Sequence, residues 1–228
     1  MPDALYQPFP IPTDARAHIW RYAPENRRPR HFHSEPELNL VAAGTGKFGV
    51  GKNILAAESG DLFWWPPGQE HELLEASPDF DLFVIGLTPA LSERVLAGDD
   101  AVTSGGPVRL RLSPGVLAKF STLCTVPLER QDVPTIERHV GDLWRDAHRL
   151  RTRAPDMHAL TRRALVSLIK QPHLARADVA SLVRGYPSEV SRHFHKDMGV
   201  TLTAYRTRLR LLKFVQAVDG GAENLLSA

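Results

Sequence analysis

The stretch HFHSEPELNLVAAG, residues 31–44, is the part of the sequence that decides the fold. Side chains alternate between the two faces of a β-strand, so His31 and His33 point to the same side. Pro36 indicates a bend, after which Glu37 joins the two histidines. The stretch therefore predicts three potential metal ligands that converge on one point.

A second stretch, GDLFWWPPGQEH at residues 60–71, supplies the fourth candidate ligand. Pro66 and Gly68 indicate a turn, and His71 follows on a later strand. Three nitrogens and one oxygen form a ligand set that suits Fe, Mn, Ni, Cu or Zn. The alternative stays open that the histidines line a pocket and hydrogen-bond a ligand or water without a metal.

The two stretches resemble the cupin superfamily. Its first motif is the pattern of residues 31–44, and its second is Gly, five residues, Pro, one residue, Gly, two residues and His, which residues 60–71 match. The resemblance implies a small β-barrel that holds a divalent metal. The implied metal ligands are His31, His33, Glu37 and His71.

Seven short candidate strands between residues 17 and 87 point to the same architecture. They are separated by turn signals such as GTG, GKN, ESG and PPG, and this close spacing favours antiparallel pairing. Phe63 and Trp65 share one face of a strand, whereas Trp64 lies on the other. Phe63 and Trp65 either line the ligand pocket or fill the core. The strands are expected at residues 17–22, 37–43, 47–51, 54–58, 61–65, 70–76 and 80–87.

The chain then switches to helical periodicity. Helices are expected at residues 89–98, 113–123, 133–153 and 156–171, with one more strand at 108–112. A seam that repeats every seven residues runs along the third of these helices through Ile136, Val140, Leu143, Ala147 and Leu150. This seam either packs on the barrel of its own chain or pairs two subunits in a homodimer.

Residues 178–199 have the pattern of a helix-turn-helix. Gly185 marks the turn, Pro187 begins the second helix and Gly199 ends it. Residues four apart on a helix share a face, which separates an inner from an outer side. The expected inward-facing residues are Val179, Leu182, Val190 and Phe194.

This segment resembles the AraC family of transcription regulators, on the run SRHFH at residues 191–195, Gly199, Tyr205, Arg208 and Leu209. Many members carry a cupin-like barrel before these helices, so the resemblance spans the whole chain. It implies that double-stranded DNA is read in the major groove, most of all by a guanidinium that bonds both O6 and N7 of guanine. The candidate DNA-binding residues are Ser188, Ser191, Arg192 and His195, with Arg192 the strongest.

The AraC family joins two helix-turn-helix units by a long helix. Residues 201–218 supply that helix, and residues 224–228 begin the next one. The second helix-turn-helix unit, and the phosphate contacts that it would make, are therefore not found in this sequence. Affinity for DNA falls steeply as phosphate contacts are lost. We therefore expect either a shortened form of a longer regulator or a protein that binds DNA weakly or as a dimer.

The net charge of +2 is the sum of an acidic N-terminal part and a basic C-terminal part. Residues 1–144 contain 13 Lys and Arg against 19 Asp and Glu, whereas residues 145–228 contain 15 against 7. A basic helical segment attached to an acidic body is typical of a phosphate-binding module. The N-terminus lacks the features of an export signal and no stretch resembles a membrane span, so a cytoplasmic location is expected.

These observations predict a multi-domain α+β protein: an N-terminal antiparallel cupin β-barrel or jelly roll, followed by an all-α helix-turn-helix region. The expected domains are a barrel that binds effector or metal at 1–130, a helical linker or dimer helix at 131–172, and an incomplete AraC-type DNA-binding region at 173–228. The leading hypothesis is an effector-responsive transcription regulator that senses a small molecule in the barrel, with no membrane partner.

Two other functions are compatible with the sequence. A metal-dependent cupin enzyme, an oxygenase or isomerase, needs open metal positions, which the ligand set provides. Against it, no separate general acid or base stands out, because Glu70 and Glu72 beside His71 are expected to face outward into solvent. The third hypothesis is a sugar- or ligand-binding barrel whose helical tail contacts other proteins.

Overall fold

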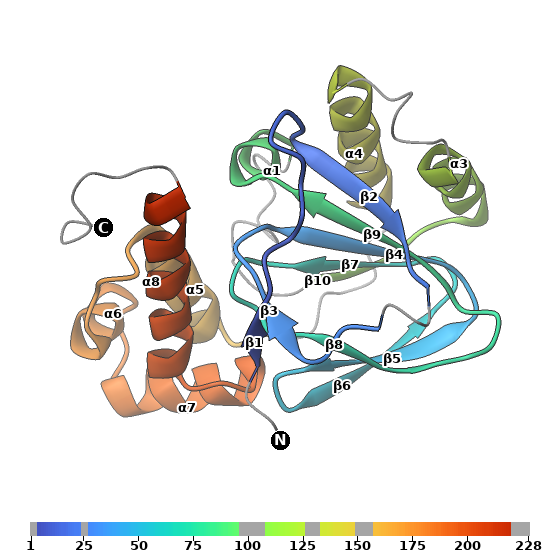
Figure 1. The fold of residues 1–228 in the computed structure, drawn as a ribbon. Helices are drawn as coiled ribbons and strands as arrows, with labels where there is room; N and C mark the ends of the chain where they lie inside the picture. The colour runs from blue at the N-terminus through green and yellow to red at the C-terminus, as the bar shows by residue number, and fades with distance from the viewer. Residues whose placement is uncertain (1–3, 24–26, 96–107, 126–132, 149–156, 220–228) are drawn as a thin grey trace.

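The computed structural model describes residues 4–23, 27–95, 108–125, 133–148 and 157–219 (Figure 1). It has an N-terminal β-barrel and a C-terminal group of helices, so the predicted α+β class is confirmed. The strands are β1 (Leu5–Tyr6), β2 (Ala17–Arg21), β3 (His31–Phe32), β4 (Glu37–Ala43), β5 (Thr45–Val50), β6 (Asn53–Glu58), β7 (Asp61–Trp65), β8 (Glu72–Ala76), β9 (Asp81–Leu87) and β10 (Val108–Arg111).

Two antiparallel sheets face each other in the barrel. One has the strand order β10-β7-β4-β9-β2 and the other β6-β5-β8. At one end, a bridge between His31 and His71 joins β3 to the segment before β8, and the backbone amides of the two residues each donate to the carbonyl of the other, at 3.1 and 3.0 Å. The small parallel pair β1-β3 extends this end toward the helices (Figure 1).

The period-two alternation of β7 separates the inside of the barrel from its outer face. Phe63 and Trp65 point inward, where they pack with Phe48 of the facing sheet. Trp64 points outward and packs edge-on against Trp144 of a covering helix. The two faces of the five-stranded sheet therefore belong to two different hydrophobic clusters.

Three of the helices that the structure describes belong to the barrel body: α1 (Pro89–Val95), α3 (Pro114–Thr125) and α4 (Val133–His148). The described part of the heptad seam, Ile136, Val140 and Leu143, is buried against the outer face of the sheet. The seam thus packs on its own barrel, whereas the homodimer stays a prediction. Residues 96–98, 149–153 and 156, and with them Leu150, lie outside the described residues.

The remaining helices form a second hydrophobic cluster, which we call the helical body: α5 (Ala159–Lys170), α6 (Arg176–Leu182), α7 (Pro187–Met198) and α8 (Leu202–Asp219). α6 and α7 form the predicted helix-turn-helix. Gly185 fits the turn because a Cβ there would lie 2.9 Å from both Leu160 and Val190. Residues 224–228, where a further helix was expected to begin, lie outside the described residues.

One predicted core residue of α6 is wrong. Leu182 is 59% exposed, whereas Val183 is buried beside Val179, Val190 and Phe194. The buried stripe of α6 runs through Val179, Ala180 and Val183, which is the C-cap residue, because Val183 lies four residues after Val179 and three after Ala180.

The barrel and the helical body meet through close backbone contacts. Gly51, in the β5–β6 turn, and Gly199, which caps α7, both have positive φ angles of 58° and 71°. A Cβ on Gly199 would lie 2.5 Å from the Cα of Gly51, so only glycines permit this approach. Nearby, the Tyr205 hydroxyl on α8 donates to the Pro67 carbonyl at 2.9 Å.

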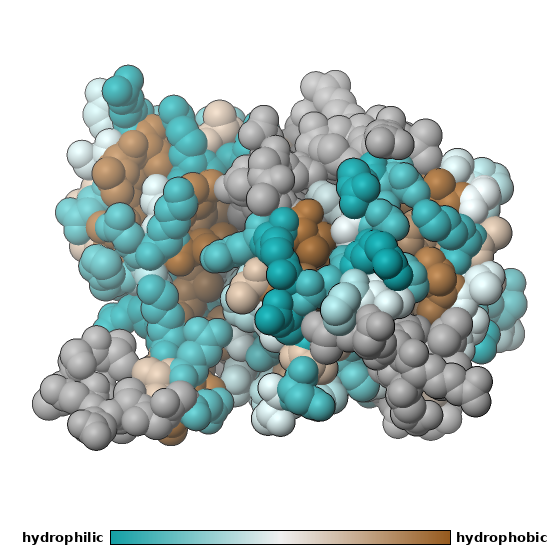
Figure 2. Space-filling view, turned by 90° about the horizontal axis from the view of Figure 1, so that it is seen from above, coloured by the Kyte–Doolittle hydropathy of each residue, from teal (hydrophilic) through white to brown (hydrophobic). Residues whose placement is uncertain are grey.

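Apolar surface gathers on the helical half of the molecule, as the view from above in Figure 2 shows. The exposed large apolar residues of the helical body include Leu211, Phe214 and Val218, which follow one another along α8. Among the described residues, no helix is long and apolar enough to span a membrane.

Candidate metal and effector site

The four predicted metal ligands come together at the end of the barrel. One ligand atom from each of His31, His33, Glu37 and His71 can be chosen so that all four atoms lie within 4.8 Å of one another. Each of the four side chains is buried. We call these four residues the His-Glu cluster. β3 and the loop after it supply the first two histidines, β4 supplies Glu37, and the segment before β8 supplies His71.

Backbone carbonyls orient all three imidazoles in the same way. The Nδ1 atoms of His31, His33 and His71 lie 2.9, 2.7 and 3.1 Å from the carbonyl oxygens of Pro29, Glu35 and Gln69. A carbonyl oxygen can only accept, so each Nδ1 carries the proton and each neutral imidazole keeps its lone pair on Nε2. These are the tautomers that metal-binding histidines adopt when a backbone carbonyl orients them.

The Nε2 atoms face a carboxylate that cannot donate to them. His33 Nε2 lies 2.9 Å and His71 Nε2 3.4 Å from the same oxygen of Glu37. Lone pairs that face each other repel, so the His-Glu cluster needs a cation, either a proton or a metal ion. The buried Nε2 of His71 has no hydrogen-bond partner in the described chain, which fits a metal ligand.

Burial and neighbouring charges shift two pKa values. Burial, together with His71, lowers the pKa of His31 to about 3, so its imidazole is neutral near pH 7. Burial by itself would raise the pKa of Glu37, but His71 and His33 outweigh it and hold that pKa well below its usual range. A neutral imidazole and an ionised carboxylate are the forms that bind metal.

A second layer of polar contacts supports Glu37. The Asn39 side-chain amide donates to Glu37 Oε1, and the Trp65 indole N–H donates to Asn39 Oδ1 at 2.8 Å. The Trp65 ring also stacks on the His71 ring, with the ring centroids 5.4 Å apart. Such outer contacts fix the orientation of ligands.

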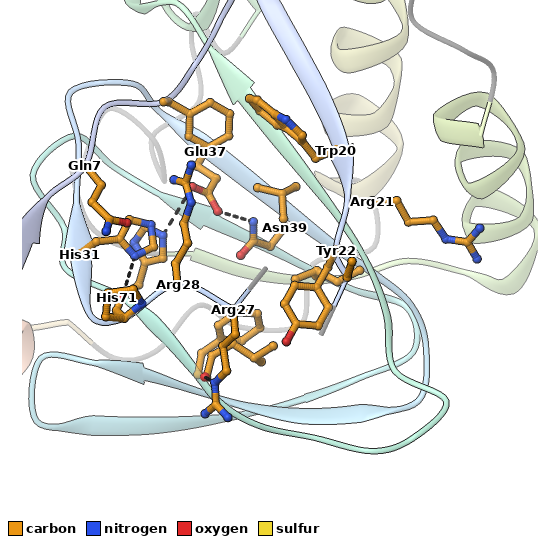
Figure 3. A pocket seen from close by; sticks show the side chains of 17 residues that line it. Gln7, Trp20, Arg21, Tyr22, Arg27, Arg28, His31, Glu37, Asn39 and His71 are labelled. Carbon is orange, nitrogen blue, oxygen red and sulfur yellow. Dashed lines mark hydrogen bonds and ion pairs between the residues drawn. The ribbon is translucent and has the colours of Figure 1, made fainter. Parts of the chain in front are cut away.

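A cavity of about 680 Å³ opens beside the His-Glu cluster (Figure 3). His31, Glu37 and His71 point into it, and Asn39 lies next to Glu37. Phe63 and Trp65, the predicted pocket residues, are not among its lining side chains, because the two rings stack on each other in the barrel core. The larger apolar side chains that line the cavity are Phe9, Trp20, Tyr22, Phe48, Leu73, Leu82 and Val84.

Glu70 does not face solvent, contrary to the expectation. It is 5% exposed and forms ion pairs with Arg30, at 3.0 Å, and with Arg208 of α8. Glu72 is half-buried and pairs with the same Arg30, at 2.7 Å. Because Arg30 and Glu70 are the sequence neighbours of His31 and His71, the helical body packs on the back of the His-Glu cluster.

The four candidate DNA-binding residues have different surroundings on α7. Ser188 and Arg192 are exposed, and the Ser191 hydroxyl donates to the Pro187 carbonyl at 2.7 Å. His195 lies at the barrel, with its Nε2 2.9 Å from the Lys52 ammonium. The start and middle of α7, which carry Ser188, Ser191 and Arg192, are therefore directed away from the barrel, whereas the part that carries His195 is not.

Several site residues were not predicted from the sequence. Asn39 had a usable signal, since it stands two residues after Glu37 and thus on the same face of β4. Phe9, Trp20 and Arg28 had none, because they come from segments that precede both motifs and reach the cavity only in the folded barrel.

The chain is similar to several solved structures, and the one at a TM-score of 0.50 supports the fold. ToxT from Vibrio cholerae O395 aligns with a TM-score of 0.50 and 10% identity, over 92% of this chain and 84% of ToxT. The AraC-like transcriptional activator CuxR aligns with a TM-score of 0.36 and 17% identity, over 89% and 74% of the two chains. A cupin 2 conserved barrel domain protein from Salinispora arenicola aligns with a TM-score of 0.30 and 22% identity, over 38% of this chain and 76% of that protein.

Comparison by sequence identifies the family. No curated protein matches the chain significantly. The family model for the AraC-like ligand binding domain, however, matches residues 14–162, which include the barrel, its covering helices and the start of α5. This chain therefore belongs to the AraC-like ligand-binding domain family.

Proposed function

We propose that this chain is a transcription regulator that responds to a small-molecule effector. The effector binds in the barrel cavity, and its binding changes how α7 meets double-stranded DNA. Support comes from the ligand-binding family, the helix-turn-helix geometry of α6 and α7, and the excess of basic residues after residue 144.

One observation carries this proposal: the segment that contains His71 touches the cavity on one side and α8 on the other. Pro67 accepts from Tyr205 and Glu70 pairs with Arg208, while His71 lines the cavity. A ligand that displaces His71 thus acts on the backbone that holds α8. Regulation requires that the effector bind two arrangements of this contact unequally.

We further propose that the His-Glu cluster binds one divalent metal ion through the Nε2 atoms of His31, His33 and His71 and a carboxylate oxygen of Glu37. When bound, the metal supplies a Lewis-acidic centre with positions left open to a donor atom of the effector. The protein orients the ligands through the three carbonyls on Nδ1 and through Asn39, and it excludes water by burial.

DNA recognition is assigned to the exposed part of α7. Arg192 is exposed and bears no carboxylate partner among the described residues. One of its guanidinium nitrogens lies 3.1 Å from His193 Nε2, which leaves its other N–H groups to bond a guanine base. Ser188 lies one helical turn earlier, where it can bond a base or a phosphate.

The DNA assignment is tested by selection from a random duplex pool at physiological salt, followed by binding titrations on the enriched sequence. Wild-type protein should enrich a defined sequence, and Arg192→Ala should weaken its binding about tenfold, which corresponds to the loss of one good base contact. Arg163→Ala is the matched control, because Arg163 is an exposed arginine on α5. Failure to enrich any sequence would refute the proposed function.

A second candidate function is a metal-dependent oxygenase or isomerase. It is favoured by one observation, namely that the His-Glu cluster opens onto the cavity and is not closed off in the core. Oxygen uptake or isomerisation by protein loaded with Fe or Mn, together with absence of sequence-specific DNA binding, would favour the enzyme over the regulator.

A further inference from the structure

The cavity is lined by three arginines, and two of them are already occupied. Arg21 makes two hydrogen bonds to Asp81, at 2.8 and 3.0 Å. Arg27 donates to the backbone carbonyls of Leu73, at 2.8 Å, and Leu74. Each of these two guanidinium groups already uses two of its nitrogens as donors to a neighbouring strand.

Arg28 is different, because it has no carboxylate or carbonyl partner among the described residues. Within the described part of the chain, its guanidinium makes a cation–π contact, 5.8 Å from the centre of the Phe9 ring. The side chain lines the cavity and is exposed. A guanidinium is a fork of donors that matches a carboxylate, so Arg28 presents an unfilled anion-binding group to the cavity.

The rest of the wall selects against a strongly polar ligand. Most of the lining is aromatic or aliphatic, and it comes from both sheets. The Asn39 amide, which points toward the site, already bonds Glu37 and Trp65. Apart from the arginines and Asn39, the polar side-chain groups on the wall belong to Gln7, Trp20, Tyr22 and three residues of the His-Glu cluster. A sugar or other polyol would therefore leave without partners the hydroxyl groups that lie against the apolar side chains, which is unfavourable.

We propose that the effector is a small organic carboxylate with an apolar body, and that Arg28 is the residue that selects for the negative charge. The carboxylate pairs with Arg28, and the apolar body lies against Trp20, Tyr22 and Leu82. A single guanidinium suits a monoanion better than a phosphate ester, which needs more donors. This inference rests on the proposed effector-binding role of the cavity.

The test compares matched acids and amides by isothermal titration calorimetry. The probes are 3-phenylpropionate with 3-phenylpropanamide, and octanoate with octanamide. At least one acid should bind wild-type protein about tenfold or more tightly than its amide, since a hydrogen bond to a charged group contributes this much. Arg28→Gln should abolish the preference, and Arg28→Lys should restore part of it. Arg21→Gln is the matched control and should retain the preference, because Arg21 lines the same cavity but is paired with Asp81.

The titrations are repeated after removal of metal by a chelator, so that a carboxylate bound by a metal is distinguished from one bound by Arg28. A preference that survives chelation and disappears in Arg28→Gln supports the proposal. Equal binding of acid and amide, no binding of either acid, or full retention of the preference in Arg28→Gln would overturn it.

The experiments distinguish failure of the proposed ligand class from failure of the proposed regulator function. Acid binding that depends on Arg28, without sequence-specific DNA binding, would sustain the ligand class and refute the regulator. Sequence-specific DNA binding that responds only to a neutral compound would sustain the regulator and refute the ligand class.

Discussion

At the scale of single residues, the His-Glu cluster is defined by where its protons lie. Three histidines donate from Nδ1 to backbone carbonyls, so their Nε2 lone pairs and the Glu37 carboxylate compete for the same space. A proton relieves this repulsion for one pair of atoms only. A divalent cation relieves it for all four residues, which is the reason for proposing a metal there.

Replacement of His71 by Gln should remove most of the metal. The expected metal content, measured by elemental mass spectrometry, is on the order of one ion per wild-type chain and about a tenth of that or less in the variant. His173→Gln serves as control because His173 is exposed on the helical body. Equal metal in wild type and His71→Gln would rule out the proposed ligand set.

The pH dependence of stability should also report on His31. Its folded pKa of about 3 lies below the ordinary value of 6.5. Between these pH values, His31 therefore binds a proton in the unfolded chain but not in the folded chain. Stability from this residue is fully present above pH 6.5 and is lost as the pH falls toward 3. In metal-free protein, the free energy of unfolding should fall by up to about 1.4 kcal/mol per pH unit over this window. Denaturant unfolding at several pH values measures the slope, and an equally steep slope in His31→Gln would contradict the assignment.

At the level of elements, the β5–β6 turn and the end of α7 come into close contact because each has a glycine there, Gly51 and Gly199. Both backbones adopt the left-handed region, and each leaves room for the other only because neither carries a Cβ. The Lys52–His195 and Asn53–Asp197 contacts flank this meeting point. The turn thus holds the C-terminal end of α7 and leaves its N-terminal half free.

Replacement of Gly199 by Ala should lower the free energy of unfolding by about 2 to 4 kcal/mol, since backbone strain adds to steric overlap. The new Cβ would lie 2.3 Å from the Lys52 amide nitrogen. The matched control is Gly60→Ala, which has a similar positive φ of 91° but no atom nearer than 3.5 Å. Strain alone predicts about 1 to 2 kcal/mol there. Equal losses in the two variants, measured by chemical denaturation, would show that the turn and α7 do not meet this closely.

At the scale of the whole molecule, the barrel and the helical body share one buried ion network. Arg30 and Arg208 approach Glu70 from opposite sides, and Arg208 also lies over the Phe32 ring, 5.1 Å from its centre. Phe32, next to His31, belongs to the hydrophobic cluster of the helical body. The proposed effector site and the proposed DNA-binding helices are therefore connected by direct neighbours in the sequence.

Arg208→Met should leave metal binding intact and weaken the effect of the effector on DNA affinity. We expect a loss of about 1.5 to 3 kcal/mol in the free energy of unfolding, the contribution of a hydrogen bond to a charged group. Metal content should stay unchanged, whereas the effect of the effector on DNA affinity should shrink. Arg210→Met is the control, because Arg210 is exposed two residues further along α8 and should change stability by less than about 0.5 kcal/mol. An undiminished response in Arg208→Met would exclude this network as the connection.

Most of the elements and the four central residues of the candidate site could be predicted from the sequence, whereas the short strands β1 and β3 were not among the strands expected. Strand and helix spans follow from short-range alternation and from Gly and Pro at the turns, and the spacings at residues 31–44 and 60–71 identified four residues that do converge. These are local patterns, in which side chains a few residues apart already decide which face is buried.

Only the tertiary structure decided what lies around that first layer. Phe63 and Trp65 fill the barrel core, Glu70 is buried, and Arg28 reaches a cavity built mainly by other strands. Each of these outcomes depends on which surface a strand meets after the chain has closed on itself. That choice is made by packing between residues such as Glu70 and Arg208, which are 138 positions apart and carry no mutual signal in a single sequence.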